Sequence, residues 1–451
     1  MIAGEKVRHM PTRLRTSDAG FEAAFRSFLT QKREVSEDVD AQVRSILADV
    51  RKRGDAAVIE LTQRFDRFDA GAKGLRIGAD EISAAVASAD AETVAALTLA
   101  RDRIAAYHQR QLPYDDRYRD ALGVELGGRW TAVEAVGLYV PGGAASYPSS
   151  VLMNAVPARV AGVPRIVMAV PSPDGQLNPL VLVAAHLAGV EEIYRIGGAQ
   201  AVAALAYGTE TIVPVVKIVG PGNAYVAAAK RQVFGKVGID SIAGPSEVLV
   251  IADRDNDPEW IAADLLAQAE HDTAAQSILM TDDAAFAEAV CAAVERQLEV
   301  LPRGAIAAES WRDFGAVILL EHFGEAPALA DRIAAEHLQI AVRDADQLAD
   351  AIRNAGAIFL GAHTPEVIGD YVAGSNHVLP TARSARFSSG LGVLDFMKRT
   401  SILRLDESAL AALGPAAMRL ASAEGLDAHR RSIAVRLGPN ALAADTKKEG
   451  A

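Results

Sequence analysis

The sequence has few of the features that mark disulfide-bonded, membrane-spanning or nucleic-acid-binding proteins. It holds one cysteine, Cys291, which excludes an intrachain disulfide and a metal site built from thiolates. No uninterrupted apolar run reaches the ~18 residues of a membrane-spanning helix, because Pro, Gly and Arg interrupt even VLMNAVPARVAGVPRIVMAV. Lys and Arg number 46 and Asp and Glu 58, so the net charge of −12 offers no electrostatic surface for nucleic acid or anionic membrane.

Several segments with a known chemical use are also missing. The N-terminal stretch MIAGEKVRHMPTRLR lacks the apolar core of a signal peptide, so we expect a cytoplasmic protein. There is no GxxxxGK[ST], no complete GxGxxG and no HExxH. Cys291 lies among alanines at helical spacing, which is typical of a packing residue, so the chain has no evident thiol for covalent catalysis. These absences leave a cytoplasmic enzyme or binding protein.

The pattern of apolar residues predicts alternating strands and helices over most of the chain. At 451 residues more than one domain is expected. Residues 36–109 have helical periodicity, and short β-rich, Gly-rich segments such as GLYVPGG and RIVMAVPS then alternate with helices. A second alternating pattern follows Pro245, and two helices are predicted in the tail from Ser388. Such alternation indicates parallel sheets, whose ligands usually bind outside the carboxyl ends of the strands.

Some polar residues are candidates for metal binding. A helix is predicted to begin at Asp257-Pro258, and on it Gln268 and His271 lie three residues apart and so share a face. Asp370 is expected on a helix that begins with Thr364 and Pro365, and His429 lies beside two arginines. An oxygen and nitrogen ligand set without thiolate suits zinc in an open catalytic site. The alternative for Gln268, Asp370 and His429 is a solvated surface side chain, and for His271 it is a satisfied surface or core imidazole.

Two further motifs allow two interpretations each. Glu336-His337 is expected where a helix meets a strand, so the imidazole either interacts with the helix dipole or forms a proton-transfer pair with the carboxyl. Gly220-Pro221-Gly222-Asn223 precedes a helix, and its spacing favours a tight turn with Asn223 as the N-cap. The alternative is a phosphate-binding turn at the helix N-terminus.

Long stretches of the sequence resemble the histidinol dehydrogenase family. They occur in the expected order from about Gly137 to His429: GLYVPGGAASYPSSVLMNAVPA, RIGGAQAVAALAYGT, KIVGPGNAYVAAAKR, GIDSIAGPSEVLVIAD, LLAQAEHD, AAEHLQI, GDYVAGSNHVLPT, SSGLGVLDFMK and LASAEGLDAHRRSI. The resemblance implies an α/β fold of two incomplete Rossmann-like domains with a small N-terminal arm and a small helical C-terminal tail domain, in an intertwined homodimer. The implied division is 1–30 for the arm, 31–138 and 248–387 for the first α/β domain, 139–247 for the NAD-binding second, and 388–451 for the tail that reaches the partner subunit.

The resemblance also implies a role for each candidate residue. It assigns Glu336 and His337 as the catalytic pair, Gln268, His271, Asp370 and His429 as ligands of one zinc per subunit, and Tyr139, Gln200 and Asn223 as NAD contacts. Substrate contacts would be Ser246, Gln268, His271, His337, Asp370, Glu424 and His429. The implied reaction oxidises L-histidinol to L-histidine through L-histidinal with two NAD. A zinc hydrolase and a non-catalytic metal-binding protein are the rival interpretations, and the missing HExxH and the AGPSEV and GPGNAY loops argue against the hydrolase.

Overall fold

The computed structural model describes residues 10–30, 37–142, 147–242 and 244–441, which fold into two compact units. Unit 1 contains the described residues up to Leu112 together with Val133–Phe396, and unit 2 contains Pro113–Ala132 and the described residues from Met397 onward. Unit 1 is built on two parallel sheets and unit 2 on a small antiparallel one, so the expected α/β class is confirmed.

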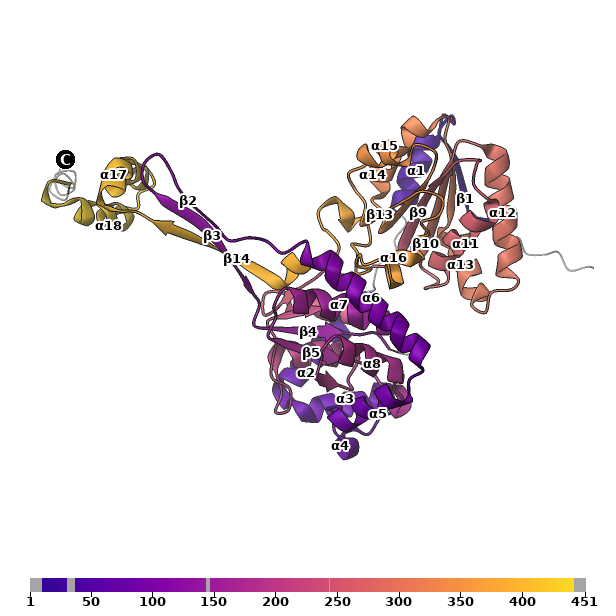
Figure 1. Cartoon of the computed structure of the whole chain (residues 1–451), viewed down its shortest axis with the longest axis horizontal. Coiled ribbons are helices and arrows are strands. Elements are labelled where there is room, and N and C mark those ends of the chain that lie inside the picture. The colour runs from indigo at the N-terminus through magenta and orange to yellow at the C-terminus, as the bar shows by residue number, and fades with distance from the viewer. Residues whose placement is uncertain (1–9, 31–36, 143–146, 243, 442–451) are drawn as a thin grey trace, which may run out of the picture. The chain divides into compact units, whose positions relative to one another are not determined.

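The first sheet of unit 1 has six parallel strands in the order β1-β11-β10-β9-β12-β13 (Figure 1). Their bounds are β1 Thr12–Arg15, β9 Glu247–Ala252, β10 Gln276–Thr281, β11 Ala316–Leu319, β12 His337–Ala341 and β13 Ala357–Leu360. The helices are α1 Phe21–Leu29, α11 Pro258–Ala269, α12 Ala284–Leu298, α13 Gly304–Phe314, α14 Ala326–Ile333, α15 Ala345–Asp350 and α16 Val367–Tyr371.

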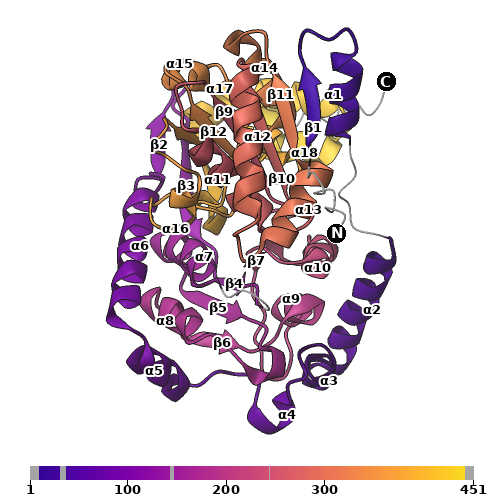
Figure 2. The ribbon, with the colours of Figure 1, turned by 90° about the vertical axis from the view of Figure 1, so that its right-hand side faces the viewer.

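Helices cover both faces of this sheet (Figure 2), which explains why its central strands are apolar throughout. In β9, Leu249 and Ile251 belong to the core that includes α1 and α14, whereas Val248 and Val250 belong to the core that includes α11 and α12. Cys291 is buried in the second core, where burial raises the pKa of its thiol to about 11, so the predicted packing role is confirmed.

The second sheet of unit 1 has five parallel strands in the order β6-β5-β4-β7-β8. Its strands are β4 Ala135–Tyr139, β5 Arg165–Ala169, β6 Glu192–Tyr194, β7 Lys217–Val219 and β8 Gly238–Ile239. The connecting helices are α7 Pro148–Val160, α8 Pro179–Leu187, α9 Gly198–Tyr207 and α10 Ala224–Val233. Starting from the central β4, the chain adds β5 and β6 on one side and then crosses to add β7 and β8 on the other.

The helices before residue 110 pack on this second sheet, which differs from their predicted grouping with 248–387. They are α2 Glu37–Arg53, α3 Asp55–Asp66, α4 Ala70–Lys73, α5 Ala79–Ser88 and α6 Ala91–Gln109. Helix α2 packs on α9 and α10, α5 on α8 and α6 on α7. The expected arm, 1–30, likewise contributes β1, which pairs with β11, and α1 to the six-stranded sheet. Periodicity reveals an apolar face but not its partner.

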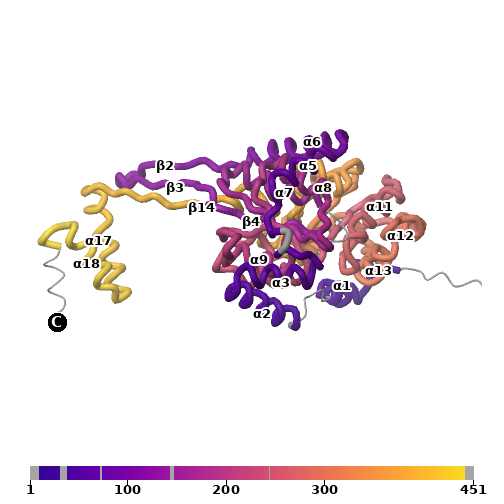
Figure 3. Tube along the Cα trace, turned by 90° about the horizontal axis from the view of Figure 1, so that it is seen from below, coloured from indigo at the N-terminus to yellow at the C-terminus, as the bar shows by residue number. Residues whose placement is uncertain are grey.

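Unit 2 is an antiparallel three-stranded sheet followed by two helices (Figure 3). The sheet contains β2 Asp116–Arg119, β3 Glu125–Ala132 and β14 Met397–Arg404, and the helices are α17 Glu407–Ala423 and α18 Asp427–Leu437. The two predicted tail helices are therefore confirmed. The division that the resemblance implies places the hairpin of β2 and β3 in the first α/β domain, whereas β3 pairs with the tail strand β14.

One bent pair of helices in the described part of the chain has the length and composition of a membrane span. No single helix there is long and apolar enough to cross a membrane, and the pair Ala79–Ser88 and Ala91–Gln109, bent by 113°, meets the criteria of length and composition only when the two are taken together.

The N-terminus of α11 gives a direct test of the helix boundary that the sequence predicts. Asp257 is the N-cap, and its carboxylate accepts a hydrogen bond from the Glu259 N–H at 2.9 Å. We expect Asp257→Ala to lower the free energy of unfolding by about 1 kcal/mol, because one helical N–H loses its acceptor. Asp257→Asn, which keeps an acceptor, should cost much less. Urea unfolding of both variants checks this, and equal losses would contradict the capping role.

Candidate active site

Glu336 and His337 lie side by side at the amino end of β12, both buried. Helix α14 ends at Ile333, four residues before the predicted junction, because Ala334 adopts a left-handed conformation with φ of 49°. A carboxylate oxygen of Glu336 accepts the Glu247 N–H at 3.0 Å, and His337 Nδ1 donates to the Glu247 carbonyl at 3.2 Å. Since a carbonyl oxygen can only accept, Nδ1 carries a proton and Nε2 is the atom open to chemistry.

Two carboxylates lie on the Nε2 side of His337. Nε2 is 3.5 Å from Asp370 Oδ1 and 3.7 Å from Glu366 Oε2. Asp370 is in α16, whose N-cap is Glu366 and not the predicted Thr364. The Thr364 hydroxyl donates to the Leu360 carbonyl instead. Glu366 is 1% exposed, and neither of its carboxylate oxygens has a hydrogen-bond partner among the described residues.

The pKa values of these buried groups lie far from their ordinary values. Burial raises the pKa of Glu336 to about 8 and that of Glu366 to about 7. Burial alone would lower the pKa of His337, but Glu336, Asp370 and Glu366 outweigh it and raise this pKa to about 10. Burial would raise the pKa of Asp370, yet its hydrogen bond to His337 makes the net change a decrease. Perturbed groups in one cluster are typical of a functional site.

The other predicted ligands from this unit lie at the end of α11. Gln268 is 1% exposed, and its amide oxygen Oε1 has no hydrogen-bond partner in the part of the chain that the structure describes. Helix α11 ends at Ala269, so His271 lies in the turn beyond the helix and not on it, and its N–H donates to the Gln268 carbonyl at 3.2 Å. The exposed His271 has a pKa lowered mainly by partial loss of hydration, an effect that Asp370 opposes and His337 reinforces. His271, His337 and Asp370 therefore share one electrostatic environment.

This donor set fits a divalent metal of the zinc type. Gln268 offers an unpartnered oxygen, His271 an imidazole nitrogen and Asp370 a carboxylate with a lowered pKa. His337, Glu366 and Asp370 form a second grouping, in which the possible ligand atoms all lie within 4.8 Å of one another. A buried amide oxygen without a partner is costly unless a cation or water satisfies it, so Gln268 favours the predicted set.

These candidate residues lie at the amino ends of strands in the six-stranded sheet, and not at the carboxyl ends that the general rule for parallel sheets favours. His337 begins β12 and pairs with Val248 near the start of β9. Ser246 directly precedes β9, is partly buried, and accepts the Gln276 N–H through its carbonyl at 2.9 Å. Because α11 returns the chain from the end of β9 to the start of β10, its C-terminal Gln268 comes to the same edge.

The two predicted tail residues belong to unit 2. Glu424 is the C-cap residue of α17 and His429 lies in the first half of α18, and both side chains are exposed. Their predicted roles toward zinc and substrate stay predictions.

The predicted NAD contacts gather at the carboxyl edge of the five-stranded sheet. Tyr139 ends β4, and its hydroxyl oxygen accepts the Gly198 N–H at 3.0 Å. Gln200 is buried in α9, and no described residue hydrogen-bonds its Oε1. Asn223 caps α10, as its position predicts, by accepting the Tyr225 and Val226 N–H groups at 3.1 and 3.2 Å. β4 and β7 are adjacent and lead to opposite sides of the sheet, which is the topological switch point where such sheets bind dinucleotides.

Sequence reasoning missed two residues of this cluster. No motif or spacing in the sequence singles out Glu366, because its place beside His337 depends on where α16 begins. His377, within the quoted GDYVAGSNHVLPT stretch, donates from Nδ1 to the Asp370 carbonyl at 3.1 Å, and its Nε2 is 3.3 Å from Ser150 Oγ. Burial lowers the pKa of His377, so its ring holds Asp370 in place through a neutral contact.

Comparison with known proteins gives consistent matches. The sequence model of the histidinol dehydrogenase family matches residues 29–437. The histidinol dehydrogenase of Brucella suis biovar 1 (strain 1330) is 70% identical over 428 residues, which cover 95% of this chain and 100% of that protein. That of Mesorhizobium japonicum is 69% identical, with the same coverage of both chains. The crystal structure of histidinol dehydrogenase from Elizabethkingia anophelis matches with a TM-score of 0.91 and 36% identity, covering 96% of this chain and 99% of that one. The chain therefore belongs to the histidinol dehydrogenase family.

Proposed function

We propose that this oxidoreductase is a zinc-dependent, cytoplasmic L-histidinol dehydrogenase. It carries out a four-electron oxidation of L-histidinol to L-histidine through L-histidinal, with two NAD molecules. The observation that supports this most is the position of the buried Glu336–His337 pair, which shares its electrostatic environment with Asp370 and His271. This supports one site for the proposed proton-transfer groups and metal ligands.

We infer that zinc is held by Gln268, His271 and Asp370 of one chain and by His429 of the partner subunit. The unpartnered Gln268 oxygen supports this set. Bound there, zinc supplies a fixed positive charge that anchors and orients a substrate with nitrogen donors. Asp370 is itself restrained, because His377 donates a hydrogen bond to its carbonyl and so holds α16 in position.

His337 is the proposed general base for the alcohol proton. Its Nδ1–H is committed to the Glu247 carbonyl, so only Nε2 can accept a proton. To do so Nε2 must be unprotonated, and the carboxylates of Glu366 and Asp370 oppose this by raising the pKa. A cation held by Asp370 offsets part of that negative charge.

Glu336 is the proposed activator of the water that hydrates the aldehyde. Its carboxylate accepts a hydrogen bond from the Glu247 N–H. Burial raises its pKa to about 8, which is close enough to neutral pH for the group to exchange protons during catalysis. Burial of both groups also keeps bulk water away from the reactive aldehyde.

We propose that NAD, which accepts the hydride, binds at the carboxyl edge of the five-stranded sheet. Tyr139, Gln200 and Asn223 contribute an aromatic ring, an unpartnered amide oxygen and an amide at a helix N-terminus. The dipole of α10, together with the N–H groups at its N-terminus that Asn223 does not bind, suits the diphosphate of a dinucleotide.

The roles of the two proton-transfer groups can be separated by starting from either substrate. His337→Asn should slow the oxidation of both histidinol and histidinal by about 10²–10⁴-fold, because it removes the base. Glu336→Gln should slow mainly the oxidation of histidinal, where water is activated. NADH formation from each substrate measures this, and equal damage to both steps by Glu336→Gln would contradict the assignment.

Metal dependence follows from the ligand set. A strong chelator should abolish NADH formation, and zinc, manganese or cobalt should restore it, because oxygen and nitrogen ligands accept several divalent ions. Gln268→Ala should lower the metal content measured by atomic absorption. Full turnover by protein shown to be metal-free would exclude this part of the proposal.

The shared site of the proposed homodimer can be tested by complementation. His271→Ala and His429→Ala should each be inactive alone, because each removes one zinc ligand. After subunit exchange, half of the dimers contain one site with both lesions and one with none, so up to about a quarter of wild-type activity per chain should return. If exchange is confirmed by mass and the mixture stays inactive, His429 serves the zinc of its own chain.

A further inference from the structure

The mechanism leaves one buried ion pair of unit 1 without a role. Lys230 in α10 and Asp240, which directly follows β8, form an ion pair, and their side chains are only 2% and 4% exposed. Removing two charges from water is costly, and apolar residues of similar size are often equally stable in such places. The pair therefore calls for an explanation beyond stability.

Both members of the pair also bind the main chain of Gly220. Lys230 Nζ donates to the Gly220 carbonyl at 3.0 Å, and the Gly220 N–H donates to Asp240 Oδ2 at 2.7 Å. Gly220 has a φ of +112°, and a Cβ at this position would lie 2.1 Å from the Tyr139 carbonyl oxygen. The ion pair thus fixes both polar groups of a residue that only glycine can occupy, pressed against the end of β4.

Gly220 begins the loop that ends at Asn223, the N-cap of α10. The loop is tight throughout, because a Cβ on Gly222 would lie 2.5 Å from Val226 in the first turn of α10. The loop therefore sets the position of the α10 N-terminus relative to Tyr139. Lys230 and Asp240 neutralise each other, so they act on this loop through geometry and not by attracting an anion.

We propose that Lys230 and Asp240 are positioning residues that hold the Gly220–Asn223 loop ready to bind the diphosphate part of NAD. The proposal rests on the proposed NAD site at this sheet edge. Preorganisation of a binding loop improves affinity because less conformational entropy is lost on binding. The pair contacts neither Glu336–His337 nor the proposed zinc ligands within the described residues, so its loss should weaken NAD binding and leave the metal bound.

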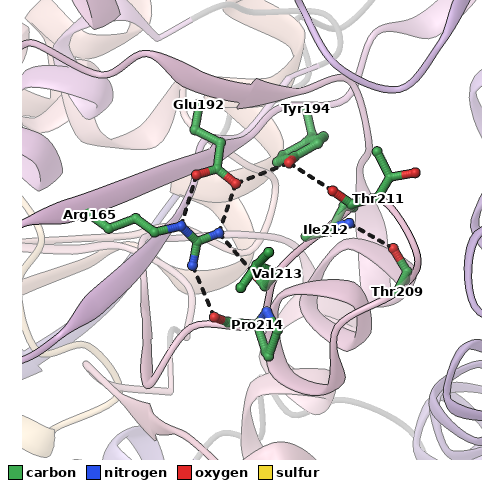
Figure 4. Close-up of polar contacts among 8 residues, drawn as sticks. All are labelled: Arg165, Glu192, Tyr194, Thr209, Thr211, Ile212, Val213 and Pro214. Atoms are coloured by element: carbon green, nitrogen blue, oxygen red, sulfur yellow. Dashed lines mark hydrogen bonds and ion pairs between the residues drawn. The ribbon is translucent and has the colours of Figure 1, made fainter.

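A second ion pair on the same sheet provides a matched control (Figure 4). Arg165 and Glu192 begin β5 and β6 at the opposite, amino edge, where two guanidinium nitrogens donate to Glu192 at 2.9 and 2.7 Å. Arg165 also donates to the Val213 and Pro214 carbonyls at 2.8 and 3.0 Å, so it too fixes a loop. Glu192→Gln therefore perturbs an ion pair of this sheet away from the Gly220 loop.

The test compares NAD affinity by calorimetry in four full-length, zinc-loaded proteins. Lys230→Met/Asp240→Leu removes both contacts to Gly220 without leaving an unpaired buried charge. It should raise the Kd for NAD about tenfold, the loss expected when one loop must be ordered on binding. Lys230→Met/Asp240→Asn keeps an oxygen that can accept the Gly220 N–H and should recover part of this loss. Glu192→Gln should stay within about twofold of wild type, and zinc content should be unchanged in all four.

The outcomes separate the two proposals. Wild-type protein that does not bind NAD would overturn the proposed function and, with it, the role of the pair. Wild-type binding with an unchanged Kd in Lys230→Met/Asp240→Leu would overturn the positioning role alone. The positioning role would also be overturned if the rise in Kd were proportional to the loss of thermal stability in all variants, including Glu192→Gln. If Lys230→Met/Asp240→Leu does not fold, a Kd for Lys230→Met/Asp240→Asn equal to wild type refutes the proposal, and a raised Kd with unchanged stability supports it.

Discussion

The arrangement of the candidate active site depends on the main chain of one residue, Glu247. Its N–H binds the carboxylate of Glu336, and its carbonyl accepts from His337 Nδ1. These contacts orient the carboxyl group and select the imidazole tautomer, and both follow from the parallel pairing of β9 with β12. A small displacement between these two strands would move the Glu336 carboxyl and the His337 imidazole together. The fully buried centre of the six-stranded sheet therefore also fixes the geometry of the reactive groups at its edge.

Much of the fold can be predicted from local patterns. The alternating strands and helices after residue 134, the two tail helices and the caps at Asp257 and Asn223 all agree with the sequence. The helices before residue 110 were predicted as helices, but their packing on the five-stranded sheet was not. An amphipathic pattern states that a face is buried, whereas the choice of partner depends on contacts between segments far apart in the chain.

The candidate site shows the same limit on a smaller scale. Gln268, His271 and Asp370 could be singled out by residue type and by resemblance. Glu366 could not, because it becomes the N-cap beside His337 only when α16 begins two residues later than the Thr-Pro signal suggests. The candidate metal ligands also lie at the sheet edge opposite to the one that the general rule favours. The rule that ligands bind at the carboxyl ends of parallel strands concerns the loops that follow strands. Gln268 and His271 lie instead at and just after the C-terminal end of α11, which leads into the next strand.

Asn223 shows how one side chain can serve the fold and a ligand without conflict. Its Oδ1 alone accepts the two N–H groups of the first helical turn, so the cap uses one end of a two-ended amide. The Nδ2 end remains a hydrogen-bond donor. Aspartate would cap a helix equally well but would present only acceptors and a negative charge, which repels phosphate. Asparagine thus caps the helix without adding a negative charge that would oppose anion binding. Aspartate at this position would keep the helix stable but would make its N-terminus a poor phosphate site.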